Sequence, residues 1–446
     1  MSKVIAFIGA GSFGFTYKLV SDILLKPALT GCEFRFMDVN RERLDNLKLL
    51  LDYHLDRVHY EKSPVYTQNM EEALTGADFI IHLTKIGFLE ASEKDMDIPK
   101  KYGLYQTVGD TCGVGGVSRG LRTMVFLEKM LGMIEKVSAP GAVVLNYTNP
   151  QQINVMAASK ISKVPFIGLC HSVQGTTRQM AKAIGVSYED ITYEAAGINH
   201  LSFILKFEKD GKDLYPALKS KAPELYQNDI STDDQIFASL GRARIDLMNR
   251  FGYMVTESSQ HLGEYVPYYM RTPKLREELD IHTDIYKKNI AAKTMDFAKK
   301  VEQAKNRTLP FPENSVEYGA EIINAMITGV PCKIYANCIN NGLISNLPDD
   351  ACVEVACMVD KNGVQPCRYG ELPMQLAMLC SMEINVHRLA VEAFIKRDWK
   401  YVYWAFMADP LVNSILTPDE IKSLTVEILN AQKDYLPEAL WECKDC

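Results

Sequence analysis

The chain has 446 residues, of which 47% are hydrophobic and 24% charged, and its formal net charge is −7 at pH 7. This length is more than one ordinary hydrophobic core accommodates, so it predicts two domains. The lack of a basic patch argues against a nucleic-acid partner, and the lack of about 20 consecutive apolar residues argues against a membrane span.

A glycine-rich loop at residues 9–14 follows an apolar strand predicted at 4–8. A helix is predicted at 15–25, and a second strand at 33–37 ends at Asp38. This order is typical of a dinucleotide-binding unit, whose helix N-terminus holds the pyrophosphate and whose acidic residue binds the adenosine ribose. A carboxylate there repels a 2′-phosphate and favours NAD over NADP, although a glycine turn in another doubly wound fold is the alternative. The predicted cofactor-binding residues are Gly9, Gly11, Ser12, Phe13, Gly14 and Asp38.

The first strand begins almost at Met1, without a charged leader, an apolar segment or a cleavage site. This start predicts a cytoplasmic protein. The eleven cysteines are then expected to be thiols, most of them buried within apolar runs.

Up to about residue 165, short apolar segments alternate with helical segments. The alternation predicts a parallel sheet with helices on both faces. We therefore expect an α/β fold in which residues 1–190 form an N-terminal Rossmann-like, doubly wound NAD-binding domain. Further strands are predicted at 79–83, 142–145 and 166–169, with helices at 41–57, after an N-cap at Asn40, and at 116–136.

From about residue 188 the pattern changes to a mixture of strands and long helices. This mixture predicts a C-terminal α+β domain at 191–446 for substrate binding, metal binding and oligomerisation. Its strands are predicted at 193–196, 202–207, 332–336 and 352–359, and its helices at 234–251, 285–302, 373–396 and 418–430.

Polar residues follow three of the predicted strands, at 146–150, 170–175 and 197–200. Ligands bind outside the carboxyl ends of the strands in an open parallel sheet, so these segments are candidates for the functional site. Taken singly, Asn149 also fits a turn residue before a proline, and Cys170 an ordinary buried cysteine.

The glycine loop, the Asn-Pro at 149–150, the Cys-His at 170–171 and the Gly-x-Asn-His at 197–200 occur in the order found in glycoside hydrolase family 4. The chain resembles these NAD- and metal-dependent glycosidases over nearly its whole length. The strings at 170–176, 196–200, 255–258 and 352–357 are most similar to the branch that acts on unphosphorylated α-galactosides and α-galacturonides. The resemblance implies a homodimer or a homotetramer.

The resemblance also implies that the Cys170 thiolate and the His200 imidazole bind a divalent metal, usually manganese, together with the O2 and O3 atoms of the sugar. Cysteine and histidine by themselves suit zinc, iron or cobalt better, so manganese rests on the resemblance alone. A two-residue site is open, as a Lewis acid that binds substrate requires. A core cysteine beside a hydrogen-bonded histidine is the structural alternative.

The family mechanism implied by the resemblance departs from hydrolysis by two carboxylates. NAD takes a hydride from C3, the metal polarises the resulting ketone, and a base removes the C2 proton while the glycosidic oxygen leaves C1. Water then adds, and NADH reduces C3 again.

Relatives carry a tyrosine before an aromatic pair, which points to Tyr265 as the base, with Glu257 or Glu264 as carboxylate alternatives. His171 is the candidate acid, or else it binds a sugar hydroxyl. Asn149 is expected to bind the substrate. Arg119, with Arg122 one helical turn further on, is expected to hold a carboxylate of the substrate.

We therefore predict an α-galacturonidase, with an α-galactosidase of the same family as the close alternative. A 2-hydroxy acid dehydrogenase and an NAD-sensing protein without turnover are the alternatives outside the family. A dehydrogenase accumulates NADH with each turnover, whereas the glycosidase does not.

Overall fold

The computed structural model describes residues 2–12, 14–228 and 239–442. Within them, parallel strands at the N-terminal end follow the order β3-β2-β1-β4-β5-β6. All five residues of β1 are buried, as expected for a strand covered on both faces. The bounds of these strands are β1 (Val4–Ile8), β2 (Glu33–Met37), β3 (Val65–Thr67), β4 (Phe79–His82), β5 (Val143–Asn146) and β6 (Phe166–Gly168).

The helices that connect these strands form two packed groups. α1 packs against α2 and α13, whereas α5 packs against α3, α4 and α6. The Asn40 side chain caps α2 by accepting a hydrogen bond from the Arg43 N–H at 3.0 Å, as predicted. The helices are α1 (Phe15–Leu24), α2 (Arg41–Arg57), α3 (Met70–Leu74), α4 (Phe88–Lys101), α5 (Gly113–Val137), α6 (Gln151–Ile161), α7 (Ser172–Ala183) and α13 (Gly319–Thr328).

The second half of the chain extends the same sheet with antiparallel strands. The sheet continues from β6 through β11, β12, β7 and β8 to β10, so that 13 strands of the described residues form one sheet. The predicted boundary near residue 190 therefore lies within a continuous sheet and stays a prediction. The added strands are β7 (Thr192–Ile198), β8 (Leu201–Lys209), β9 (Lys212–Asp213), β10 (Met254–Val255), β11 (Cys332–Ile339), β12 (Cys352–Asp360) and β13 (Gly363–Pro366).

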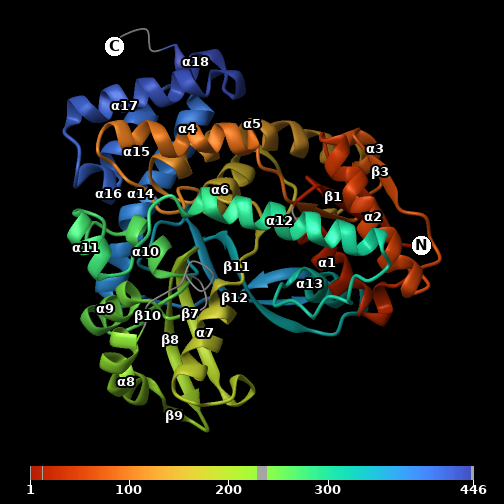
Figure 1. Cartoon of the computed structure of the whole chain (residues 1–446), viewed down its shortest axis with the longest axis horizontal. Coiled ribbons are helices and arrows are strands. Elements are labelled where there is room, and N and C mark those ends of the chain that lie inside the picture. Colours follow the sequence, from red (N-terminus) through yellow and green to blue (C-terminus); the bar gives the residue numbers. More distant parts are fainter. Residues whose placement is uncertain (1, 13, 229–238, 443–446) are drawn as a thin grey trace.

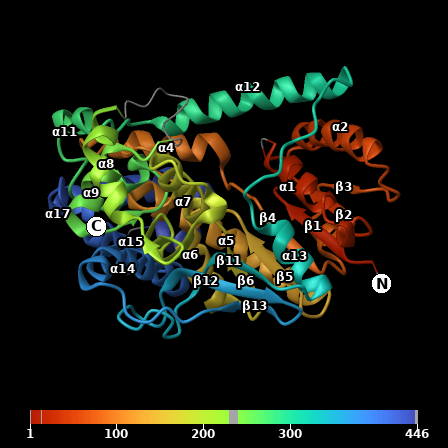
Figure 2. The same cartoon turned by 90° about the horizontal axis from the view of Figure 1, so that it is seen from below.

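The C-terminal helices pack on the helices of the first half. α14 lies against α5 and α6, and α17 lies against α4. In Figure 1 they form the blue upper left part of the molecule, and in both views α12 runs along the outside from near α11 to α2 (Figure 2). These helices are α8 (Tyr215–Asn228), α9 (Arg242–Phe251), α10 (Ser259–Tyr265), α11 (Pro273–Glu278), α12 (Ile285–Lys305), α14 (Met374–Lys396), α15 (Lys400–Ala408), α16 (Pro410–Asn413), α17 (Pro418–Ala431) and α18 (Glu438–Trp441).

The fold agrees with the predicted α/β class, a parallel N-terminal sheet with an α+β second half. The predicted helix 234–251 is shorter in the structure, where it begins at Arg242, and the start predicted at 234 lies outside the described residues. Phe13 also lies outside them. The nine cysteines of the described part are unpaired. Among the described helices, none has the length and apolar character required to cross a bilayer.

Candidate functional site

The glycine loop joins β1 to α1 in the way that dinucleotide binding requires. The N–H groups of Gly9 and Ala10 both donate to the Met37 carbonyl at 2.9 Å, which ties the loop to the end of β2. Gly9 has a φ of +85°, and a Cβ atom there would lie 2.8 Å from the backbone of Leu83 and Thr84. Glycine is therefore required at this position, because the backbone conformation and the space both exclude a side chain.

Asp38 lies beside this loop at the end of β2. Its Oδ2 atom accepts a hydrogen bond from the Gly11 N–H at 2.8 Å, and its Oδ1 atom accepts one from the Asn40 N–H at 2.8 Å. Each oxygen retains a second lone pair, so the carboxylate can also accept hydrogen bonds from ribose hydroxyls. These contacts fit the role predicted for Asp38.

A cavity of about 1210 Å³ extends over the glycine loop. Its wall includes the carboxyl ends of β1, β2 and β4, the face of α12 and the segment 309–316. The volume suits an extended dinucleotide better than a small metabolite. Every described residue predicted to bind the cofactor lines this cavity, namely Gly9, Gly11, Ser12, Gly14 and Asp38.

The register of four neighbouring strands brings the two predicted metal ligands together. Gly168 at the end of β6 pairs with Asn337, Asn337 pairs with Glu354, and Glu354 pairs with Gly197. Cys170 follows β6, and His200 lies in the turn between β7 and β8. The two residues therefore lie at the same level of the sheet although 29 residues separate them in sequence, and Cys170 Sγ lies 3.5 Å from His200 Nε2.

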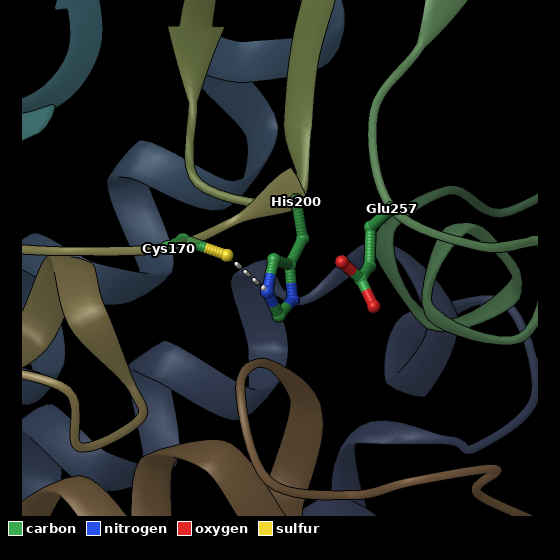
Figure 3. A group of neighbouring side chains, drawn as sticks. All are labelled: Cys170, His200 and Glu257. Atoms are coloured by element: carbon green, nitrogen blue, oxygen red, sulfur yellow. Dashed lines mark hydrogen bonds between the residues drawn. The ribbon is translucent and has the colours of Figure 1, made fainter. Parts of the chain in front are cut away.

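Glu257 completes this group from a third direction, as Figure 3 shows. It follows β10, which pairs with β8, and the Thr256 N–H donates to the Ser202 carbonyl at 2.8 Å. A thiol sulfur, an imidazole nitrogen and a carboxylate oxygen of Cys170, His200 and Glu257 all lie within 4.8 Å of one another. Sequence reasoning considered Glu257 as a base and did not identify it as a ligand.

Two of these three residues have a left-handed backbone, with φ of 62° at His200 and 70° at Glu257. Such conformations are costly for residues other than glycine and persist where the surroundings impose them. A buried arginine supplies part of that support. Arg244 donates to the Val255 carbonyl at 2.8 and 3.0 Å and to Thr176 Oγ1 at 2.9 Å, and Thr176 Oγ1 also accepts the Glu257 N–H at 3.2 Å.

The chemistry of these three side chains fits a divalent cation. Burial lowers the pKa of His200 to about 4, so its imidazole is neutral and can donate a lone pair. Its Nδ1 atom is buried and makes no hydrogen bond within the described residues. Burial, followed by the carboxylates of Glu257 and Glu354, raises the pKa of the Cys170 thiol. A cation at this position would reverse that effect and favour the thiolate.

Asp110 connects this group to the cofactor cavity. It lines the cavity, accepts a hydrogen bond from Arg119 Nη1 at 2.9 Å, and has Oδ1 4.0 Å from His261 Nε2. Burial would raise the pKa of this carboxyl, but Arg119, His261 and Lys85 together hold it below its ordinary value. Asp110 is therefore a partly buried anion that lies between the cofactor cavity and His261.

His261 is a site residue that the sequence analysis missed. Its ring centroid is 4.4 Å from that of His200, and its Nδ1 atom is 3.2 Å from Ser258 Oγ and 3.8 Å from a Glu257 carboxylate oxygen. Burial and the neighbouring His200 lower its pKa to about 4, so the imidazole is neutral. The spacing of four residues from His261 to Tyr265 was the available signal, because both residues lie in α10 and residues four apart share one side of a helix.

Tyr265 and Glu264 lie further from the metal-binding group. The Tyr265 ring centroid is 6.4 Å from that of His200, and its side chain is fully buried in the core. Burial, then Cys112 and Glu383, raise the pKa of Tyr265 well above its ordinary value, although Gln152 and Thr111 act to lower it. Glu264 accepts hydrogen bonds from the N–H groups of Thr107 and Gly109 at 2.6 and 3.0 Å and so holds the loop before Asp110.

His171 follows Cys170 directly, and its side chain is about half exposed. Its Nδ1 atom lies 3.1 Å from an oxygen of the buried Glu317. The hydrogen bond to this carboxylate raises the pKa of His171. His171 therefore holds a proton more readily than an ordinary histidine, as an acid catalyst requires.

The predicted substrate-binding residues meet at Asp110. Asn149 Nδ2 lies 3.5 Å from Asp110 Oδ2, the same oxygen that Arg119 contacts. Arg122 makes two hydrogen bonds to Asp95, at 2.6 and 3.0 Å, and is buried with it. The Arg122 guanidinium is therefore paired with a carboxylate inside the protein and is not placed to hold a substrate carboxylate.

Lys85 was also missed by the sequence analysis. It follows β4 and lines the cavity, and its ammonium nitrogen is 3.7 Å from the centroid of the Tyr286 ring. Burial, and next the positive charge of Arg119, lower its pKa to about 6.

Comparison with known proteins assigns both halves of the chain to one protein family. Residues 4–186 match the model described as Family 4 glycosyl hydrolase, and residues 195–412 match its C-terminal domain. The chain is 38% identical to an alpha-galactosidase of Bacillus subtilis (strain 168), over 98% of this chain and 99% of the relative. It is 30% identical to an alpha-galacturonidase of Thermoanaerobacter italicus, over 97% of both chains.

A solved structure agrees with this assignment. The 6-phospho-beta glucosidase from Thermotoga maritima, determined with manganese, NAD+ and glucose-6-phosphate, has a TM-score of 0.77 and 25% sequence identity, over 97% of this chain and 99% of that chain. The resemblance inferred from the glycine loop, the Cys-His pair and the Gly-x-Asn-His is therefore confirmed, and the chain belongs to glycosyl hydrolase family 4.

Proposed function

We propose that this protein hydrolyses α-galactosidic bonds with NAD and a divalent metal, through oxidation at C3 and elimination of the glycosidic oxygen. The observation that carries the proposal is Asp110, which lines the cofactor cavity and lies 4.0 Å from His261, whose ring in turn packs against the ring of His200 at a centroid distance of 4.4 Å. Chemistry that needs a nicotinamide and a Lewis acid on one sugar ring requires this adjacency. Manganese is proposed because the Thermotoga maritima relative was determined with it.

When bound, NAD would accept and later return the C3 hydride, and the metal would polarise the C3 carbonyl. Cys170, His200 and Glu257 would hold the metal, and three protein ligands would allow sugar oxygens to bind it as well. Asp110, kept anionic by Arg119, orients His261 and, with Asn149, the sugar hydroxyls.

For removal of the C2 proton we propose His261 as the base. It is neutral, lies between His200 and Asp110, and has Ser258 and Glu257 beside its Nδ1 atom. Tyr265 remains the alternative, but its hydroxyl is buried in the core and its pKa is raised, which disfavours proton transfer. His171, whose pKa is raised by its hydrogen bond to Glu317, is proposed to protonate the leaving oxygen.

Two observations favour an α-galactoside as the substrate. The alpha-galactosidase relative is more similar to this chain than the alpha-galacturonidase relative, at 38% against 30% identity. In addition, Arg119 and Arg122 are paired with Asp110 and Asp95, so neither guanidinium is free to hold a C6 carboxylate.

An α-galacturonide, the substrate expected from the sequence, is the second candidate. Lys85 supports it, because this lysine lines the cavity near Arg119. A uronate carboxylate would restore the lysine charge that burial disfavours.

A panel of para-nitrophenyl glycosides, assayed with NAD, Mn²⁺ and a thiol, tests the proposal. We expect cleavage of the α-galactoside without net formation of NADH. Faster cleavage of the α-galacturonide would instead select the second candidate. Net NADH production with a hydroxy acid, and no glycoside cleavage, would contradict both.

A homodimer or homotetramer also remains a proposal. Large apolar side chains are exposed on α14 and α15, namely Met374, Met378, Ile395 and Trp404, and such a surface is typical of a contact between subunits. Light scattering coupled to size exclusion measures the mass directly.

A further inference from the structure

Helix α12 presents a polar stripe to the cofactor cavity. Seven of its residues line that cavity, and five polar ones among them are spaced alternately by four and three positions, which places them on one face of the helix. They are Asn289, Lys293, Asp296, Lys300 and Gln303. This polar face of α12 therefore faces the cavity above the glycine loop.

α12 is attached to other helices near both of its ends. At the start, Lys287 pairs with Asp97 of α4 at 2.9 Å. Near its end, Phe297, Val301 and Ala304 are buried, and the helix packs on α2. Residues 291–296 are exposed. The helix thus bridges α4 and α2 along the outside of the molecule, as Figure 2 shows, with the cavity beneath it.

Lys300 of this stripe lies beside the glycine loop. A Cβ atom built on Gly14 would lie 4.0 Å from the Lys300 ammonium nitrogen and 3.9 Å from Phe297 Cδ2. Gly14 is the N-cap of α1, so the ammonium lies close to a helix N-terminus, whose dipole attracts phosphate. Asp296, one turn earlier on α12, pairs with the ammonium at 2.6 Å, but the Asp296 side chain is 59% exposed. An exposed ion pair of this kind is weak, so a phosphate can replace the carboxylate, unlike in the buried pair of Arg122 and Asp95.

We propose that α12 binds the pyrophosphate of the dinucleotide, with Lys300 contacting a phosphate oxygen and Lys293 contributing a second positive charge from the same face. This inference rests on the proposed function for the presence of NAD. The glycine loop supplies N–H groups but no full positive charge, whereas a pyrophosphate carries two negative charges. Lysine supplies that charge as a compact donor.

The consequence is that the cofactor lies between the two halves of the chain. The first half contributes the glycine loop and Asp38, and the second half contributes α12. A cofactor that must return its hydride to the same sugar has to remain bound between the two transfers, and contacts on both sides slow its release.

The affinity for NAD, measured by calorimetry without substrate or metal, tests the proposal. We expect Lys300→Gln to weaken NAD binding about ten-fold, the effect of one charge-assisted hydrogen bond, and Lys300→Arg to restore most of it. Lys299→Gln is the matched control, because Lys299 is exposed on the same helix and does not line the cavity. Increasing salt should reduce the difference between Lys300→Gln and the unmodified protein.

A second ligand locates the contact on the cofactor. ADP-ribose contains the pyrophosphate and adenosine does not, so Lys300→Gln should weaken binding of ADP-ribose and leave that of adenosine unchanged. Equal NAD affinity in Lys300→Gln, Lys299→Gln and the unmodified protein would overturn the role of α12 and leave the proposed function intact. Failure of the unmodified protein to bind NAD would overturn both.

Discussion

Two substitutions of Glu257 can separate the energetic cost of its backbone conformation from its proposed role as a metal ligand. Its φ of 70° is expected to cost about 1–3 kcal/mol in a residue other than glycine. Glu257→Gly removes this cost but also lowers the free energy of unfolding by about 0.5–1 kcal/mol, because glycine makes the unfolded chain more flexible. Glu257→Gln keeps the backbone and the shape of the side chain and removes only the charge.

The two variants should therefore differ in stability and have similarly weak affinities for the metal. We expect Glu257→Gly to be more stable than Glu257→Gln by about 1 kcal/mol, a rise in Tm of about 2 °C or less in a chain of this size. Both should bind Mn²⁺ at least about 100-fold more weakly than the unmodified protein, since even changes beyond the ligands cost about 10–100-fold at metal sites.

Calorimetric unfolding without metal gives the stabilities, and a titration that follows the paramagnetic resonance signal of free Mn²⁺ gives the affinities. Glu90→Gln, on the exposed side of α4, is the control for loss of a carboxylate. Retention of full Mn²⁺ affinity in Glu257→Gln would remove Glu257 from the ligands. A glycine variant less stable than the glutamine variant would refute the reasoning about strain.

Cys170→Ser should lose Mn²⁺ binding and activity with an unchanged Tm, because a hydroxyl replaces a thiolate poorly as a ligand. The resonance titration measures the Mn²⁺ affinity and calorimetry measures the Tm. A normal Mn²⁺ affinity would show that the thiol has a structural role only. His261→Gln should lower kcat at least about 100-fold with little change in KM, and Tyr265→Phe much less, as expected of a general base; the reverse order would restore Tyr265 as the base. Glu317 raises the pKa of His171. Activity should therefore fall as the pH rises through the pKa of His171, because the acid then loses its proton. Glu317→Gln should move this fall to lower pH in a pH–rate profile, and an unmoved profile would exclude His171 as the acid.

Elements defined by local sequence were predictable. The segment from β1 through the glycine loop to Asp38 is such a case, since the strand, the turn glycines and the acidic residue lie within 35 positions and each has its own local signal. The N-cap at Asn40 was predictable for the same reason.

Features that depend on pairing between distant segments were not predictable. The joining of β11 to β6, which makes the two halves one sheet, rests on a single aligned pair, Asn337 and Gly168. His261 and Lys85 became site residues only when the fold placed them beside Asp110. Glu257 could be named as a carboxylate from its sequence, but its positive φ and its approach to Cys170 and His200 are tertiary properties.

The incorporation of deuterium at C2 tests the central claim most directly. The protein is allowed to hydrolyse para-nitrophenyl α-galactoside completely in heavy water with NAD and Mn²⁺, and the free galactose is analysed by NMR. Removal of the C2 proton by a base that exchanges with solvent predicts deuterium at C2 and no net NADH. Galactose without deuterium at C2, together with the absence of a primary isotope effect from substrate deuterated at C2, would contradict the account and indicate direct displacement at C1.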